Sequence, residues 1–194
     1  MNSPRINPYS KDNLRRHLKG CAYCVLGFVT IIWMVELANM MMGHRLSSLG
    51  ILPRTTRGLI GILLSPFLHS SIIHVMANTI PFIVLGGLVA LRGVGVFLEL
   101  SLLVTILGGA ALWLIGRPSF HVGASGLIFG YFGFIIARGW FYRSFGSLII
   151  ASITLILYGG ILWGLLPTYT YVSWEGHLCG LLAGIIGARL DKPD

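Results

Sequence analysis

The chain has 194 residues, of which 55% are hydrophobic and 10% are charged, and its mean hydropathy is +0.83. Soluble domains carry about 25% charged residues, so this composition excludes an ordinary soluble domain and indicates a multi-pass membrane protein. The net charge of +8 does not indicate a nucleic-acid partner, because the basic residues form no stripe and lie at the ends of apolar runs. The lipid bilayer is therefore the expected surrounding.

Residues 1–20 are polar and basic, and we expect them to form a short cytoplasmic tail. The apolar run that follows is too long for the apolar part of a cleavable signal peptide, so we interpret it as a retained helix. Cys21 and Cys24 open this run with the spacing of a redox or metal motif. Because the sequence offers no second ligand pair, we interpret both as small apolar helix residues and expect no metal or cofactor.

Six apolar runs are long enough to cross a bilayer, which takes about 20 residues of α-helix. They cover residues 21–42, 72–91, 94–116, 124–142, 147–166 and 173–190. The predicted fold is an all-α polytopic membrane protein, with one bundle of six transmembrane helices over residues 21–191. The long connection 43–70 contains prolines and a short amphipathic piece, and we expect it to form a structured loop at the outer membrane interface.

The positions of the basic residues predict the orientation, because Lys and Arg concentrate on the cytoplasmic side of a membrane. If the N-terminus lies in the cytoplasm, only four of the 14 Lys and Arg residues fall on the outer side: Arg45, Arg54, Arg57 and Arg117. We therefore expect an integral membrane protein with both termini in the cytoplasm. The compact size favours a bacterial inner (plasma) membrane, and an organellar membrane is the alternative.

Glycines in the sixth run predict a close contact between two helices. Gly176, Gly180 and Gly184 follow i,i+4 spacing, which places them on one helix face and lets a neighbouring helix approach closely. If the fourth run packs on this face, Ser125 and His177 can meet, since each lies near the start of its own run.

Ser125 and His177 are the candidate nucleophile and base. A serine at a helix start is surrounded by free backbone N–H groups, and the helix dipole there favours developing negative charge. A histidine can take the serine proton and later protonate the leaving amine. Glu175 is two residues from His177 and turns to another face, so we predict a dyad without an orienting carboxylate. Taken singly, the serine is also consistent with a small packing residue and the histidine with an interhelical hydrogen bond.

His74 and Asn78 are a third polar element, at i,i+4 spacing near the outer start of the run 72–91. Two polar side chains on one face can donate hydrogen bonds to an oxyanion, although an interhelical hydrogen-bonded pair would explain them equally well. Under the predicted topology these two residues, Ser125 and His177 all lie at the same outward depth. Independent structural residues need not share a depth, so the coincidence favours an active site.

At these residues the chain resembles the rhomboid family of intramembrane serine proteases, over nearly all of residues 21–191. Three motifs carry the resemblance: Gly123-Ala124-Ser125-Gly126, His177 with Gly180 and Gly184, and His69 with His74 and Asn78.

The resemblance implies that Ser125 is the nucleophile and His177 the general base. It implies an oxyanion hole formed by His74, Asn78 and the backbone N–H of Ser125, with His69 bracing the outer loop.

Five further residues bear on the resemblance or on the site. Phe129 falls where many members carry a tyrosine that stacks on the catalytic histidine, and it keeps the ring without the hydroxyl. Thr56-Arg57 departs from the Trp-Arg pair that anchors the outer loop in many members. Arg117 and His121 precede the serine, and we expect them to line the entrance to the site rather than to react.

The implied function is that of an intramembrane serine endopeptidase that cleaves transmembrane segments near the extracytoplasmic face. Its expected partner is a membrane protein with a helix-destabilised transmembrane segment. One alternative is a rhomboid-like protein that binds clients without cleaving them. The other is a small transporter that uses Glu36, Glu99 and the histidines as a pathway. We expect Glu36 and Glu99 as buried acids in the first and third runs, where snorkelling at a helix end or an interhelical hydrogen bond would also explain them.

Overall fold

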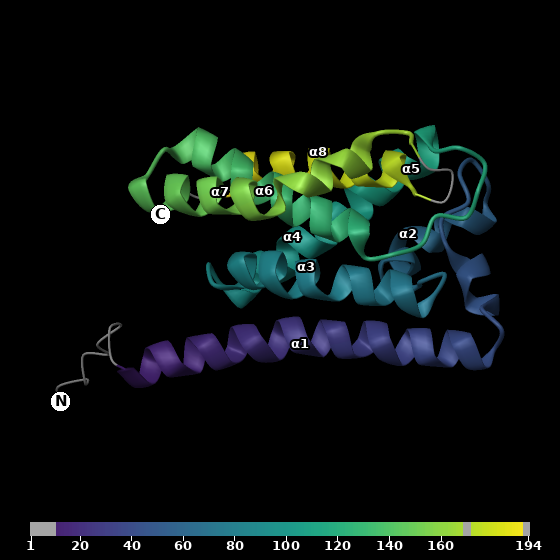
Figure 1. The fold of residues 1–194 in the computed structure, drawn as a ribbon, viewed down its shortest axis with the longest axis horizontal. Coiled ribbons are helices and arrows are strands. Elements are labelled where there is room, and N and C mark those ends of the chain that lie inside the picture. The colour runs from purple at the N-terminus through teal and green to yellow at the C-terminus, as the bar shows by residue number, and fades with distance from the viewer. Residues whose placement is uncertain (1–10, 169–171, 192–194) are drawn as a thin grey trace, which may run out of the picture.

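The computed structural model describes residues 11–168 and 172–191, and these residues are almost entirely helical (Figure 1). The main helices are α1 (Lys11–Met41), α3 (Ile72–Ala90), α4 (Val94–Leu103), α5 (Gly109–Ile115), α6 (Ser125–Tyr142), α7 (Phe145–Tyr158) and α8 (Trp174–Leu190). A π-helical turn, Val104–Gly108, joins α4 to α5, and a 3₁₀ helix, Gly159–Leu165, continues α7. The short helix α2 (Gly61–Leu64) lies in the loop between α1 and α3, with 3₁₀ turns at Arg45–Leu49, Arg57–Leu59 and Ser65–Phe67.

The six predicted runs all form helices, but the first begins earlier than predicted. Helix α1 starts at Lys11 rather than at residue 21, because its first ten residues are mostly good helix formers and Asp12 suits the positive end of the helix dipole. Residues 1–10 of the predicted tail lie outside the described residues. The all-α class is confirmed, and residues 11–20 of the predicted tail belong to helix α1.

Four helical segments are long and apolar enough to cross a membrane. They are Lys11–Met41, Ile72–Ala90, Val94–Ile115 and Phe145–Leu165. Helices α6 and α8 are shorter, with 18 and 17 residues, and many of their side chains are buried inside the bundle. Several apolar helices of this length are typical of an integral membrane protein. The count of six crossing helices stays a prediction.

Helix α6 lies at the centre of the bundle, where it contacts α3, α7 and α8. Helix α1 packs along α3 at one edge of the molecule, as Figure 1 shows. The α6–α8 contact is the closest, because Gly180 and Gly184 lie directly against α6 and a Cβ on either would overlap a carbonyl of that helix. The contact agrees with the glycine spacing, except that a Cβ on Gly176 would meet Ser173 and Leu112 instead.

The connection 43–70 is a structured loop that is tied to the end of α5. Arg54 adopts a left-handed conformation (φ 58°), and its guanidinium donates to the carbonyls of Leu114 (3.0 Å) and Gly116 (2.8 Å). Arg57, the arginine of the Thr56-Arg57 pair, donates to Ser48 within the loop. Arg54, rather than Arg57, therefore anchors the loop to the end of α5 through side-chain hydrogen bonds.

Candidate active site

Ser125 is the first residue of α6, and the turn before it is held in a single conformation. Gly123 has a φ of +124°, which is strained for a residue with a side chain. A Cβ on Gly123 would also lie 2.9 Å from the His74 ring. The Gly123 N–H donates to the Ser65 carbonyl at 2.9 Å, which ties the turn to the loop 43–70. The Ser125 hydroxyl is thus presented at a helix start, beside N–H groups with no partner within the helix.

His177 lies in the first turn of α8, and the structure brings it to Ser125: His177 Nε2 is 3.0 Å from Ser125 Oγ. His177 Nδ1 is 2.8 Å from the Gly164 carbonyl oxygen. A carbonyl only accepts, so Nδ1 carries the proton and Nε2 is left to accept from the serine hydroxyl. The Phe129 ring stacks on the imidazole, with centroids 4.2 Å apart and 9° between the planes.

The Gly164 carbonyl thus takes the place of the carboxylate that orients the histidine of a catalytic triad. Sequence reasoning missed this partner. No signal for it exists in the sequence, because every residue carries a backbone carbonyl and only the path of the chain decides which one reaches the ring.

His74 and Asn78, from the first two turns of α3, converge on the turn before Ser125. Measured from the place where Gly123 would carry a Cβ, His74 Nε2 lies at 2.9 Å and Asn78 Nδ2 at 3.6 Å. The Ser70 hydroxyl lies 3.2 Å from His74 Nδ1. If that hydroxyl donates, the His74 proton is on Nε2, where it points to the turn. Two donors are therefore available beside the Ser125 backbone N–H.

His69 is completely buried and connects the outer loop with the site. Its Nε2 accepts from the Ala124 N–H (3.3 Å) and from Asn78 Nδ2 (3.1 Å), so it holds both the residue before Ser125 and a candidate oxyanion donor. Its backbone carbonyl accepts from Asn39 Nδ2 (2.9 Å) and from the Ser47 hydroxyl (3.1 Å). This arrangement matches a bracing role and leaves no exposed ring atom for a substrate.

Burial and, to a smaller extent, the neighbouring His74 lower the pKa of His69 from its ordinary 6.5 to about 3. The Phe67 carbonyl opposes the shift to a smaller extent. The His69 ring is therefore neutral at physiological pH, as its two accepted hydrogen bonds require.

Folding stability should consequently fall as the pH drops below 6.5. The unfolded chain binds a proton at His69 below pH 6.5, whereas the folded chain does not until about pH 3, so protons favour unfolding in this window. At pH 5 the expected loss from His69 is about 2 kcal/mol. Thermal unfolding in detergent between pH 8 and pH 5 should show a steeper loss of melting temperature for the wild type than for His69→Gln. Parallel curves would contradict the assignment, since His121, whose pKa burial also lowers, contributes equally to both proteins.

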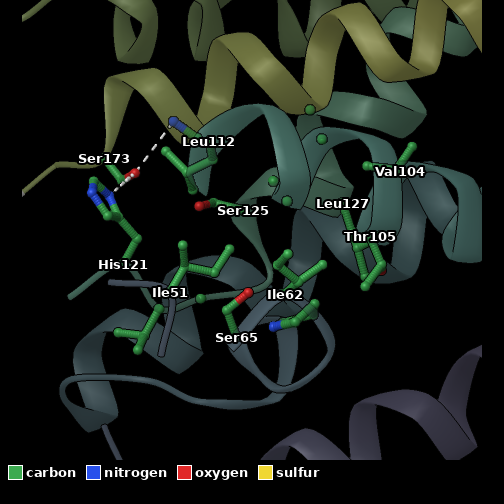
Figure 2. Close-up of a pocket in the computed structure, with 18 residues that line it drawn as sticks. Ile51, Ile62, Ser65, Val104, Thr105, Leu112, His121, Ser125, Leu127 and Ser173 are labelled. Carbon is green, nitrogen blue, oxygen red and sulfur yellow. Dashed lines mark hydrogen bonds between the residues drawn. The ribbon is translucent and has the colours of Figure 1, made fainter. Parts of the chain in front are cut away.

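A cavity of about 470 Å³, including its open mouth, borders Ser125. Figure 2 shows His121 and Ser173 at one end of it, Val104 and Thr105 at the other, and Ser125 between them. His121 Nδ1 is 2.7 Å from the Ser173 hydroxyl, which also accepts from the Gly176 N–H and so caps α8 just before His177. His121 thus borders the cavity and supports the start of the helix that carries His177.

Arg117 and Glu175 form an ion pair beside this cavity. The Arg117 Nε lies 3.6 Å from Glu175 Oε1, the backbone N–H of Arg117 donates to the same oxygen at 3.4 Å, and its guanidinium donates to the Val172 carbonyl. Glu175 is buried and turned to Arg117 rather than to His177.

The two acids expected in the interior behave differently. Glu36 is completely buried in α1, where it accepts from Asn39 Nδ2 (3.4 Å). Glu99 is exposed on α4, so the expectation that it is buried was wrong. The buried face of α4 holds Phe97 and Leu100, and Glu99 turns away from it. Within residues 11–168 and 172–191, no group of three or more His, Cys, Asp or Glu residues is arranged to hold a metal ion.

Fold and site together define a class: helical proteins with long apolar helices in which a serine and a histidine meet at the starts of two closely packed helices. Comparison with known families agrees, because the family model of the Rhomboid domain matches residues 56–192. The chain belongs to the rhomboid family, whose members are generally intramembrane serine proteases.

Several relatives resemble the chain over most of its length. An uncharacterized protein of Mycobacterium tuberculosis is 43% identical over 175 residues, which cover 86% of this chain and 73% of the relative. An uncharacterized protein of Mycobacterium leprae is 40% identical over 192 residues, covering 94% of this chain and 76% of the relative. A putative rhomboid protein of Acanthamoeba polyphaga mimivirus is 28% identical over 139 residues, which cover 68% of this chain and 75% of the relative.

Proposed function

We propose that the protein is an intramembrane serine endopeptidase that uses a Ser125–His177 dyad. The observation that carries this proposal is the 3.0 Å contact between His177 Nε2 and Ser125 Oγ, with the opposite ring nitrogen engaged by a carbonyl. That arrangement gives the histidine the tautomer needed to accept the serine proton. Its support from Gly164, Phe129 and Ser173 limits movement of the ring.

In the proposed reaction, Ser125 Oγ attacks the scissile carbonyl carbon while His177 Nε2 takes the hydroxyl proton. The carbonyl oxygen becomes an oxyanion that receives hydrogen bonds from His74 Nε2–H, Asn78 Nδ2–H and the Ser125 backbone N–H. The tetrahedral intermediate collapses, His177 returns the proton to the leaving amine, and an acyl-enzyme remains. Water, activated by His177, then hydrolyses the ester and restores the serine.

The proposed substrate is a membrane protein whose transmembrane segment is weakened as a helix near the extracytoplasmic face. In an intact helix each backbone carbonyl is bonded within the helix and shielded by side chains, so a scissile carbonyl becomes accessible only where the helix unwinds. The position of Ser125 at the helix end remote from the predicted cytoplasmic side supports cleavage at that depth. No cofactor enters the proposed steps.

The proposal is tested by reaction of the purified, detergent-solubilised protein with a fluorophosphonate probe. Wild-type protein should form one covalent adduct, and peptide mass spectrometry should place it on Ser125. A folded wild-type protein that stays unmodified, while an active rhomboid protease reacts in parallel, would contradict the proposal and favour client binding without cleavage.

The oxyanion donors give a second measurable consequence. Asn78→Ala should slow phosphonylation of Ser125 by about 10²- to 10³-fold, because the probe's developing oxyanion loses one donor while the nucleophile remains. The second-order labelling rate is measured beside that of Met76→Ala, which removes an exposed side chain from the same helix. Equal rates for Asn78→Ala and wild type would remove Asn78 from the proposed oxyanion hole.

A further inference from the structure

One side chain of helix α1 reaches the segment that carries His69, although the proposed chemistry uses no residue of this helix. Figure 1 shows α1 at the edge of the bundle, on the far side of α3 from α6. Asn39, in the last turn of α1, is completely buried. Its side chain forms hydrogen bonds with both ends of the loop 43–70, at Leu46 and Ser47 and at His69. A satisfied buried network of this kind holds its members in one arrangement.

The orientation of the Asn39 carboxamide follows from its partners. The Leu46 backbone N–H lies 3.0 Å from Oδ1 and can only donate, so Oδ1 is the acceptor and Nδ2 faces the other partners. Nδ2 carries two hydrogens, and its two shortest contacts are with the His69 carbonyl oxygen (2.9 Å) and the Ser47 hydroxyl (3.0 Å). Glu36 Oε2 lies 3.4 Å from Nδ2 and favours the same orientation, because a flipped amide would set two oxygens against each other.

The His69 carbonyl needs partners from elsewhere in the chain because His69 lies between two helical segments. The 3₁₀ turn Ser65–Phe67 ends before it, and α3 begins after it at Ile72. The Ser47 hydroxyl accepts from Asn39 and donates to the His69 carbonyl at 3.1 Å, so this carbonyl receives two side-chain hydrogen bonds. Asn39 and Ser47 together form a clamp on the His69 backbone.

The His69 ring extends from this clamped backbone to the proposed site. Its Nε2 accepts from the Ala124 N–H and from Asn78 Nδ2, and the ring meets the His74 ring edge to face, with centroids 4.9 Å apart. It thus touches the residue before Ser125 and both side chains proposed as oxyanion donors. A shift of the His69 backbone would displace all three groups, and a misplacement of about 1 Å at a reacting centre lowers rates by about 10²-fold.

We propose that Asn39 and Ser47 are positioning residues for the reaction at Ser125. They hold the His69 carbonyl, and the His69 ring passes this position on to Asn78 and to the turn before the serine. This role rests on the proposed dyad chemistry. It gives the outer end of α1 and the start of the loop 43–70 a part in setting the reaction rate without contact with the substrate.

The test compares two neighbouring hydroxyls of one 3₁₀ turn. Ser47→Ala removes a donor to the His69 carbonyl, whereas Ser48→Ala removes a hydroxyl that donates to the Arg45 carbonyl within the loop. The purified full chain in detergent is treated with a fluorophosphonate over a range of concentrations. This yields the maximal rate constant of phosphonylation (kinact) and the half-saturating concentration (KI). We expect Ser47→Ala to lower kinact by about 3- to 10-fold at unchanged KI, and Ser48→Ala to change neither.

Asn39→Ala removes the other donor of the clamp and the acceptor of the Leu46 N–H, so it should lower kinact by about 10²-fold. Unfolded molecules lower the labelled fraction but leave the rate constant of the folded ones unchanged, so the time course separates a loss of folding from a loss of positioning. Ser47→Ala is a small change at a half-buried residue, and it decides the matter if Asn39→Ala does not fold.

A double-mutant cycle with His69→Ala determines whether the effect passes through the imidazole. This background keeps the backbone carbonyl and removes the ring, so adding Ser47→Ala should change kinact by less than about 2-fold. The proposal is overturned by an unchanged kinact in folded Ser47→Ala, by an equal fall in Ser48→Ala, or by an undiminished effect of Ser47→Ala in the His69→Ala background. Wild-type protein that does not label would remove the dyad itself, and this role with it.

Discussion

Replacing either Ser125 or His177 with alanine should abolish covalent labelling by a fluorophosphonate, with a fall in rate of at least about 10⁴-fold. Ser125→Ala removes the atom that forms the bond. His177→Ala leaves the hydroxyl without the acceptor that lies 3.0 Å from it, so the serine stays protonated and unreactive. The measurement is the rate of adduct formation by intact-protein mass spectrometry, with the melting temperature as a check of folding.

The matched control for this experiment is Ser65→Ala, which removes another hydroxyl from the cavity beside Ser125. It should label at nearly the wild-type rate, because Ser65 contacts the Gly123 turn through its backbone carbonyl, which alanine keeps, and not through its hydroxyl. Labelling that survives in Ser125→Ala would place the reactive group elsewhere. Labelling that survives in folded His177→Ala at the wild-type rate would remove the histidine from the mechanism.

Gly184→Ala should produce the largest loss of stability among single-methyl substitutions in the bundle. The added Cβ would overlap the Gly130 carbonyl of α6, and backbone atoms on both sides must move to relieve it. Overpacking of this kind costs about 3 kcal/mol. The shift also separates α8 from α6, and a displacement of about 1 Å at a reacting pair lowers rates by about 10²-fold. Melting temperature and labelling rate should therefore fall together.

Gly87→Ala provides the comparison, since it adds the same methyl group to another helix of the bundle. A Cβ at Gly87 meets nothing within 4 Å, so alanine should be neutral or should stabilise α3 by up to about 1 kcal/mol. Equal effects of the two substitutions would show that the α6–α8 contact is looser than the structure indicates.

Much of the site could be anticipated because its residues are chemically unusual for their surroundings. A serine, two histidines and an asparagine within apolar runs stand out against their neighbours, and their shared depth made them one group. The glycine spacing in α8 predicted the contact that brings Ser125 and His177 together. Motif spacing of this type is readable because side chains three or four residues apart share a helix face.

The parts that could not be anticipated rest on backbone groups or on pairs far apart in the chain. The Gly164 carbonyl that holds His177 has no sequence signature. The pairing of Arg54 with the carbonyls at the end of α5 depends on how the outer loop folds back. The same applies to the contacts among Arg92, Arg138 and Asp191, which lie near or just past the ends of α3, α6 and α8 and meet because those ends lie close together.

The sequence by itself determined the helical membrane class, the approximate helix ranges and the identity of the polar residues at the site. These follow from composition and from periodicity along one helix, which are local properties of the chain. Only the tertiary structure decided which ring nitrogen of His177 faces Ser125, and how His69 joins the outer loop to Asn78 and Ala124. Those features depend on distances between helices, which arise when close packing at glycines fixes one arrangement of the bundle.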